Sequence, residues 1–191
     1  MPRRSSANVT VETWWQVRIE LLGVEARVWR RIFVPGNVTL PKLDRVLRAS
    51  MGWANNHLHE FVIGGVRYGA PDPDFARELG HVDERNVELA AALGPNARCF
   101  DYVYDFGDDW HHVVLIEDRY AQAHEIRCVA GENACPPEDV GGVPGYERFL
   151  AVMADPRHPE RREMLDWIGG RFDPGAFDIE AVNRALAKIR A

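Results

Sequence analysis

The residues best suited to chemistry lie in one short stretch, residues 104–112, where aspartates and histidines surround a single glycine. Carboxylates suit Mg²⁺ or Mn²⁺, and mixed sets of histidine and aspartate suit Zn²⁺ or Mn²⁺. An alternative requires no ligand, because aspartates in a tight turn accept backbone hydrogen bonds and Gly107 would supply a positive φ. The stretch therefore predicts a polar site or a hairpin connector, and its candidate residues are Asp105, Asp108, Asp109, His111 and His112.

Two further histidines, His57 and His59, stand two positions apart in a segment that is expected to be a strand. Alternate residues of a strand point to the same face, so the two imidazoles would form half of a metal site. The alternative is a pair of histidines that bind neighbouring carbonyl groups at a sheet edge. The predicted metal ligands are His57, His59, Asp108 and His111, and a divalent metal is the one cofactor that these residues suggest.

The segment 135–142 cannot be regular structure, because two prolines and two glycines fall within it. Glu138 and Asp139 lie in this stiff loop, which would hold their carboxylates in place for a site. Alternatively, the loop only crosses from sheet to helices, or one carboxylate caps the next turn. Cys128 and Cys135 are separated more widely than the usual cysteine pair of a zinc site, which favours a buried strand residue and a loop residue.

Arg30 shares a predicted strand face with Val28 and Ile32, and a buried arginine needs an oxygen partner. We expect that partner to be one of the aspartates of residues 105–109. The acidic stretch and the basic-aromatic stretch would then form a structural network of Trp29, Arg30, Tyr104 and Trp110. Arginine beside tryptophan can also bind nucleic acid, but strand alternation places Trp29 and Arg31 opposite Arg30.

Hydrophobic periodicity supplies the elements that would position these residues. Strict alternation predicts strands over 13–22 and 27–34, and apolar residues at helical spacing predict a helix over 40–51. Further strands are predicted over 57–63, 100–106 and 110–118, with the last in the sheet interior. Residues 69–84 are expected to be irregular, 87–93 are ambiguous, and three short helices follow residue 143. The predicted fold class is α+β, a mostly antiparallel sheet packed with an early helix and a C-terminal group of short helices.

Length and composition fit a folded protein of 191 residues, 46% of them hydrophobic and 27% charged. No apolar run is long enough to span a bilayer, and no secretory signal is recognisable. Three cysteines cannot form a closed disulfide set, which favours the cytoplasm. Residues 1–12 are expected to be a disordered tail, and 13–191 a single domain that is strand-rich over 13–130 and helical over 143–191.

Several motifs in sequence order resemble the plasmid pRiA4b ORF-3-like family. The resemblance implies an α+β domain of unknown biochemical role, often encoded on plasmids or near mobile elements, with no catalytic residue to carry over. The resembling stretches are Val28-Trp29-Arg30-Arg31-Ile32, Met51-Gly52-Trp53, His57-Leu58-His59-Glu60-Phe61, residues 102–112, residues 131–142 and Gly145-Tyr146.

We predict a non-catalytic binding or adaptor module that uses the cleft between the 105–109 turn and the 135–142 loop. Its partner would be a peptide, a nucleic acid or a small molecule, although the acidic middle of the chain argues against a phosphate backbone unless a cation intervenes. The second hypothesis is a metal-dependent hydrolase or nuclease-like enzyme using His57, His59, Asp105, Asp108, Asp109, His111 and Glu138. The third hypothesis is a purely structural protein.

Overall fold

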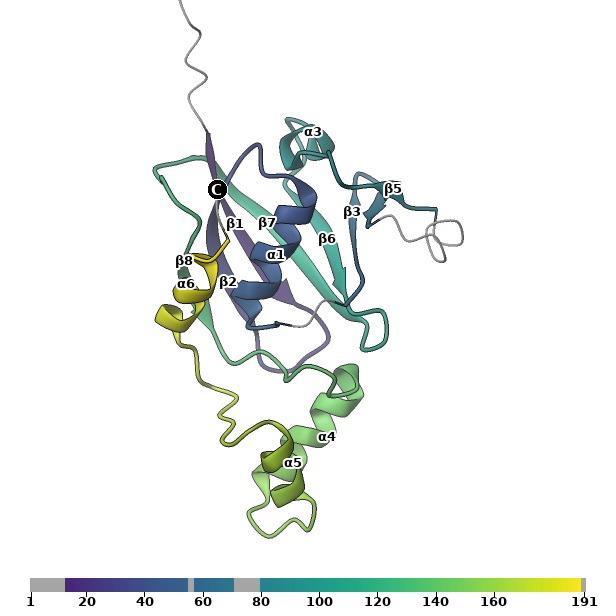
Figure 1. Cartoon of the computed structure of the whole chain (residues 1–191), viewed down its shortest axis with the longest axis vertical. Coiled ribbons are helices and arrows are strands. Elements are labelled where there is room, and N and C mark those ends of the chain that lie inside the picture. Colours follow the sequence, from purple (N-terminus) through teal and green to yellow (C-terminus); the bar gives the residue numbers. More distant parts are fainter. Residues whose placement is uncertain (1–12, 55–56, 71–79, 190–191) are drawn as a thin grey trace, which may run out of the picture.

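One eight-stranded sheet dominates the computed structural model, with α1 lying across one of its faces (Figure 1). The structure describes residues 13–54, 57–70 and 80–189, and the predicted tail 1–12 lies outside them. The strand order is β5-β4-β3-β6-β7-β1-β2-β8, and every neighbouring pair is antiparallel except β4 and β5. The strands are β1 (Trp14–Leu21), β2 (Trp29–Pro35), β3 (His59–Ile63), β4 (Val66–Gly69), β5 (Val82–Asp83), β6 (Cys99–Tyr104), β7 (Trp110–Ala121) and β8 (Arg127–Glu132).

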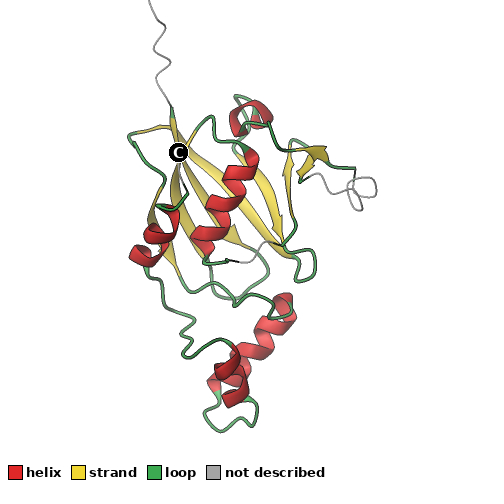
Figure 2. Cartoon of the chain, viewed as in Figure 1, coloured by secondary structure: helices red, strands yellow, loops and turns green. Residues whose placement is uncertain are grey.

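The helices fall into an early one, a short middle one and a late group (Figure 2). Together with the antiparallel sheet, they confirm the predicted α+β class. Among the described residues, no helix is both long enough and apolar enough to cross a membrane. The helices are α1 (Leu40–Met51), α3 (Leu89–Leu93), α4 (Gly142–Ala154), α5 (Arg161–Trp167) and α6 (Ile179–Leu186).

The core forms where alternating strand residues meet α1. In β1, Val17, Ile19 and Leu21 are buried, while the residues between them remain partly exposed. This period-two pattern gives the sheet one apolar face, which α1 covers with its own buried leucines. α1 ends where Gly52 adopts a left-handed φ of 97°. The chain therefore turns sharply after α1 and delivers Trp53 to the site described below.

The structure differs from the prediction in several parts of the chain. β3 begins at His59 rather than at residue 57, and the ambiguous 87–93 segment contains α3. Strands β4 and β5 and the extent of β8 were not predicted, and β5 lies within the expected irregular segment 69–84. Of the expected irregular excursion, residues 71–79 lie outside the described residues. The register of β2 and β8 shifts between Arg31 and Ile32, and this β-bulge breaks the alternation by which a strand is recognised.

The edge strand β8 is covered by α6. The side-chain amide of Asn183 accepts a hydrogen bond from the backbone N–H of Cys128 at 2.8 Å and donates one to its carbonyl oxygen at 3.0 Å. The amide thus takes the place of a neighbouring strand and protects this edge from association. Cys128 is fully buried in β8, which confirms its prediction as a buried strand residue.

Candidate functional site

The acidic turn between β6 and β7 is held by its own aspartates. An Oδ1 oxygen of Asp105 accepts the Gly107 N–H at 3.0 Å, and the Asp109 N–H donates to the Asp105 carbonyl oxygen at 2.6 Å. The positive φ angles belong to Asp105 (58°) and Asp109 (55°), so their assignment to Gly107 was wrong. Aspartate can visit this region because its short side chain hydrogen-bonds locally.

The loop 133–141 is fixed from two sides. The Trp53 indole donates to the Pro136 carbonyl oxygen at 3.1 Å. The Arg30 guanidinium donates to the carbonyl oxygens of Glu132 and Asn133, both at 2.8 Å. A loop with such anchors can present its outward side chains in a defined geometry.

Arg30 does not bind an aspartate of the turn, contrary to the prediction. Its side chain is buried, and its remaining bonds also go to carbonyl oxygens, including that of Ser50 at 3.1 Å. The Phe177 ring lies 4.4 Å from the guanidinium carbon. Burial lowers the pKa of Arg30. Carbonyl dipoles at the strand and helix ends supply the negative charge, so a carboxylate partner is unnecessary.

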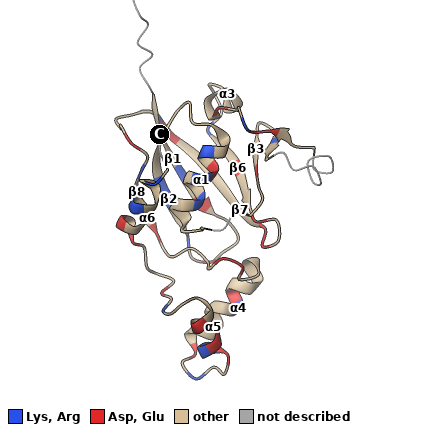
Figure 3. Ribbon diagram, in the orientation of Figure 1, with Lys and Arg blue, Asp and Glu red and all other residues tan. Residues whose placement is uncertain are grey.

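Asp108 joins the turn to the loop. Its Oδ2 oxygen accepts the Gly141 N–H at 3.1 Å. At Gly142, which has a φ of 66°, an added Cβ would lie only 2.4 Å from the Asp108 carbonyl oxygen. The backbones can approach this closely only because residue 142 has no side chain. Figure 3 shows acidic residues on both of the segments that meet here.

A histidine and several carboxylates converge at this junction. His57 Nε2 lies 3.2 Å from Asp139 Oδ1 and 3.7 Å from Asp105 Oδ2. One ligand atom from each of His57, Glu138 and Asp139 lies within 4.8 Å of the other two. Atoms placed about 2.0–2.6 Å from a shared ion would have such separations. These three residues could therefore hold a divalent cation.

Tyr104 forms the inner wall of this group. Its hydroxyl oxygen lies 3.5 Å from Glu138 Oε1. Burial, and then the charge of Glu138, raise the pKa of Tyr104 above its ordinary value. The phenol therefore keeps its proton at neutral pH and can donate toward the Glu138 carboxylate.

The predicted metal quartet is not brought together. His59 Nε2 lies 3.1 Å from Glu84 and its Nδ1 3.3 Å from Asp44, whereas His111 pairs with Asp109 at 3.0 Å. Only His57 of the predicted set joins the new cluster, while Asp108 binds the loop backbone. The spacing argument fails because residue 57 precedes β3, so the strand period does not relate the two histidines.

The predicted network of Trp29, Arg30, Tyr104 and Trp110 divides into two pairs. The Arg30 guanidinium donates to the Trp29 carbonyl oxygen at 2.7 Å, and the Trp29 indole N–H donates to Glu132 Oε2 at 2.9 Å. Tyr104 and Trp110 instead stack on Trp53, with ring centroids 4.9 and 6.1 Å away. The role of Trp53 was not predicted, and the signal that could have indicated it is a tryptophan directly after the glycine that ends α1.

His112, a predicted polar-site residue, is a core residue. It is fully buried, its Nδ1 lies 3.2 Å from the Tyr102 carbonyl oxygen, and burial lowers the pKa of its imidazole from 6.5 to about 3. A lowered histidine pKa means that protonation favours the unfolded chain. The stabilising contribution is therefore complete above pH ~6.5 and is lost as the pH falls toward ~3.

We expect the wild-type protein to lose about 1.5 kcal/mol more unfolding free energy than His112→Phe between pH ~6.5 and ~5. Carboxylates such as Glu117 change the unfolding free energy only at lower pH, because the pKa of Glu117 is lowered from its ordinary value of 4.5, mainly by the hydrogen bond from Arg31. Urea titrations at both pH values measure the effect, with exposed His111→Gln as the control. An equal loss in the wild-type and His112→Phe proteins would contradict the assignment.

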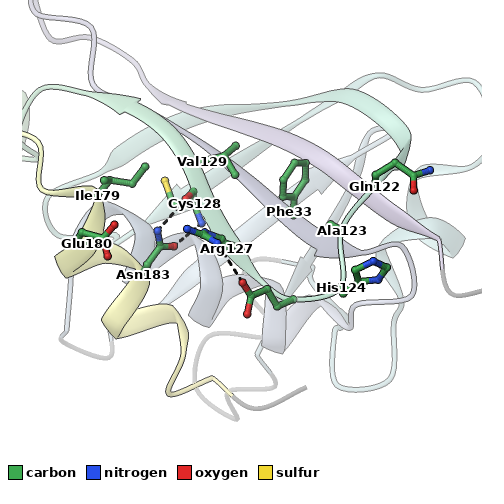
Figure 4. A pocket seen from close by; sticks show the side chains of 11 residues that line it. Phe33, Gln122, Ala123, His124, Arg127, Cys128, Val129, Ile179, Glu180 and Asn183 are labelled. Carbon is green, nitrogen blue, oxygen red and sulfur yellow. Dashed lines mark hydrogen bonds and ion pairs between the residues drawn. The ribbon is translucent and has the colours of Figure 1, made fainter.

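A hollow lies elsewhere, between β8, α6 and residues 122–125 (Figure 4). Its volume is about 460 Å³, and Phe33, Val129 and Ile179 supply its apolar lining. None of the predicted site residues lines it. The hollow and the histidine-carboxylate cluster are separate features, and the metal-compatible donors described above belong to the cluster.

The structure is an α+β fold with a cluster of one histidine and several carboxylates at the end of its sheet. The chain belongs to the plasmid pRiA4b ORF-3-like protein family, whose model matches residues 13–181, and this confirms the predicted resemblance. It is 37% identical over 180 residues to the uncharacterized protein y4hQ of Sinorhizobium fredii, with 92% of each chain covered. A crystal structure of MM3350, a protein of unknown function from Methanosarcina mazei Go1, matches with a TM-score of 0.77 and 34% identity, covering 88% of this chain and 97% of that one.

Proposed function

We propose that the protein is a binding domain whose ligand surface is the junction of the 105–109 turn and the 133–141 loop, with a divalent cation as part of that surface. One observation carries the proposal: His57, which precedes β3, and Glu138 and Asp139, which are neighbours in the 133–141 loop, place their ligand atoms within 4.8 Å of one another. A nitrogen donor combined with carboxylates suits Zn²⁺ or Mn²⁺. The anchored loop supports this proposal because it keeps two of the donors in place before any ion binds.

Metal titration of untagged, chelator-treated protein tests the cation site. We expect one Zn²⁺ or Mn²⁺ per chain by calorimetry, with affinity at least about tenfold lower in His57→Gln and in Asp139→Asn, because each removes a ligand. The matched control is His111→Gln, which removes the imidazole of an exposed histidine-aspartate pair with a 3.0 Å contact. Binding that is lost in the control, or retained in both ligand variants, would refute the site.

A metal-dependent hydrolase is the second candidate, and Asp105 is the observation that favours it. One of its oxygens is occupied by the Gly107 N–H, while Oδ2 points to within 3.7 Å of His57 Nε2. A carboxylate so placed could take a proton from a water molecule at the cation. If the protein hydrolyses a substrate and Asp105→Asn abolishes this activity with cation affinity unchanged, the protein is an enzyme rather than a binding domain.

The proposal also includes a location in the cytoplasm and an association with mobile elements. The three free cysteines fit a cytoplasmic protein, and the family suggests an association with plasmids or mobile elements. Peptides, nucleic acids and small molecules are the candidate ligands. The acidic residues around the cation site favour ligands that reach the surface through the metal ion rather than by direct phosphate contact.

A further inference from the structure

Trp167 on α5 is an unusual surface residue. Half of its side chain (50%) is exposed, and α5 has no buried residue. Four of the other tryptophans are buried, and Trp29 is half-buried. Tryptophan combines a large apolar area with an electron-rich ring face, so its exposure on a short helix is characteristic of a contact surface.

A groove of about 400 Å³ lies beside Trp167, between α4 and α5. These helices lie beyond one end of the sheet (Figure 1), and the groove lining does not include the cation-site residues. The groove is lined by Arg148, Glu160, Glu163, Met164 and Trp167.

The charged side chains that line the groove differ in whether they form an ion pair. Arg148 and Glu160 form an ion pair across the groove at 2.6 Å. Glu163 has no cation within ion-pair distance in the described part of the chain. Because Glu163 and Trp167 are four residues apart on a helix, the free carboxylate and the ring lie on one face.

We propose that this groove binds an arginine or lysine side chain of a partner protein. The cation would lie against the Trp167 ring and pair with Glu163, while its aliphatic stem packs on Met164. Arg148 already shows that a guanidinium group fits at the rim of the groove, beside Glu160. The site is independent of the proposed cation surface, so either can fail without the other.

The probe pair is a short peptide with one central arginine and the same peptide with citrulline, which keeps the shape of arginine and removes its charge. The readout is the indole N–H signal of Trp167 in ¹H–¹⁵N spectra, assigned by its disappearance in Trp167→Phe. We expect a saturable shift with the arginine peptide and none with citrulline. Glu163→Gln should weaken binding about two- to fivefold, the range of an exposed cation contact.

Glu147→Gln is the matched control, because Glu147 is an exposed glutamate on α4 outside the groove lining. It should bind like the wild type. Equal shifts with arginine and citrulline peptides would overturn the proposal, because the contact would then be apolar only. So would the absence of any shift, or an equal loss of affinity in the two glutamine variants. All variants can be confirmed as folded from the same spectra.

Discussion

Replacing Asp44 with alanine is expected to lower the free energy of unfolding by about 3–5 kcal/mol. The Asp44 side chain is only 5% exposed and accepts hydrogen bonds from the Arg48 guanidinium at 2.8 Å and the Tyr102 hydroxyl at 2.7 Å. Its Oδ1 also lies 3.3 Å from His59 Nδ1. The substitution would leave a buried guanidinium without its carboxylate, which costs more than the pair itself contributes.

The chain contains a natural control for Asp44. Arg162 and Asp166 have the same four-residue helical spacing, but their side chains are 94% and 77% exposed and 3.9 Å apart. Asp166→Ala should therefore change stability by less than about 0.5 kcal/mol. Adding Arg48→Met to Asp44→Ala should recover part of the loss, because the buried guanidinium that has lost the Asp44 carboxylate is removed as well. Urea denaturation measures the unfolding free energy of the wild type and of the three variants. A similar loss in the Asp44 and Asp166 variants would contradict the buried-charge explanation.

The sheet and the flanking helices were predictable because their hydrophobic residues repeat with the period of the element. β1 alternates strictly, and α1 and α6 carry apolar residues at helical spacing. The Asp178 side chain accepts the Ala181 N–H and so caps the N-terminus of α6. A strand residue was expected at Cys128, but the extent of β8 was not predicted because its register shift disrupts the period-two pattern. Local periodicity thus reveals elements only where the backbone remains regular.

The segments that form the site were predictable from the sequence, but the contacts between these segments were not. The stretches around Asp105 and Asp139 were both candidates, but nothing in local spacing relates them to His57. Their proximity depends on the loop anchors at Trp53 and Arg30, which are tertiary hydrogen bonds to carbonyl groups. A backbone carbonyl carries no residue-type signal, so the partner of Arg30 could not be inferred from side chains, and a carboxylate was expected instead.

Gly142→Ala is expected to disturb stability and the cation site together. An alanine there would require a φ of 66°, and its Cβ would lie 2.4 Å from the Asp108 carbonyl oxygen, so turn and loop would have to separate. The left-handed conformation alone costs about 1–2 kcal/mol, and the displacement adds to it. We expect the free energy of unfolding to fall by about 2–4 kcal/mol in total. Because Asp139 lies on the displaced loop, Zn²⁺ or Mn²⁺ affinity should fall as well.

Gly169→Ala separates these two contributions. Gly169 has a comparable φ of 76°, but an added Cβ would have nothing within 4 Å. This variant should lose only the conformational part, about 1–2 kcal/mol, and should bind the cation as the wild type does. Denaturation and calorimetry on both variants would show whether the close approach of the turn and loop builds the site. Unchanged cation affinity in a folded Gly142→Ala protein would mean that His57, Glu138 and Asp139 are positioned without this contact, and the loop anchors at Trp53 and Arg30 would then have to suffice.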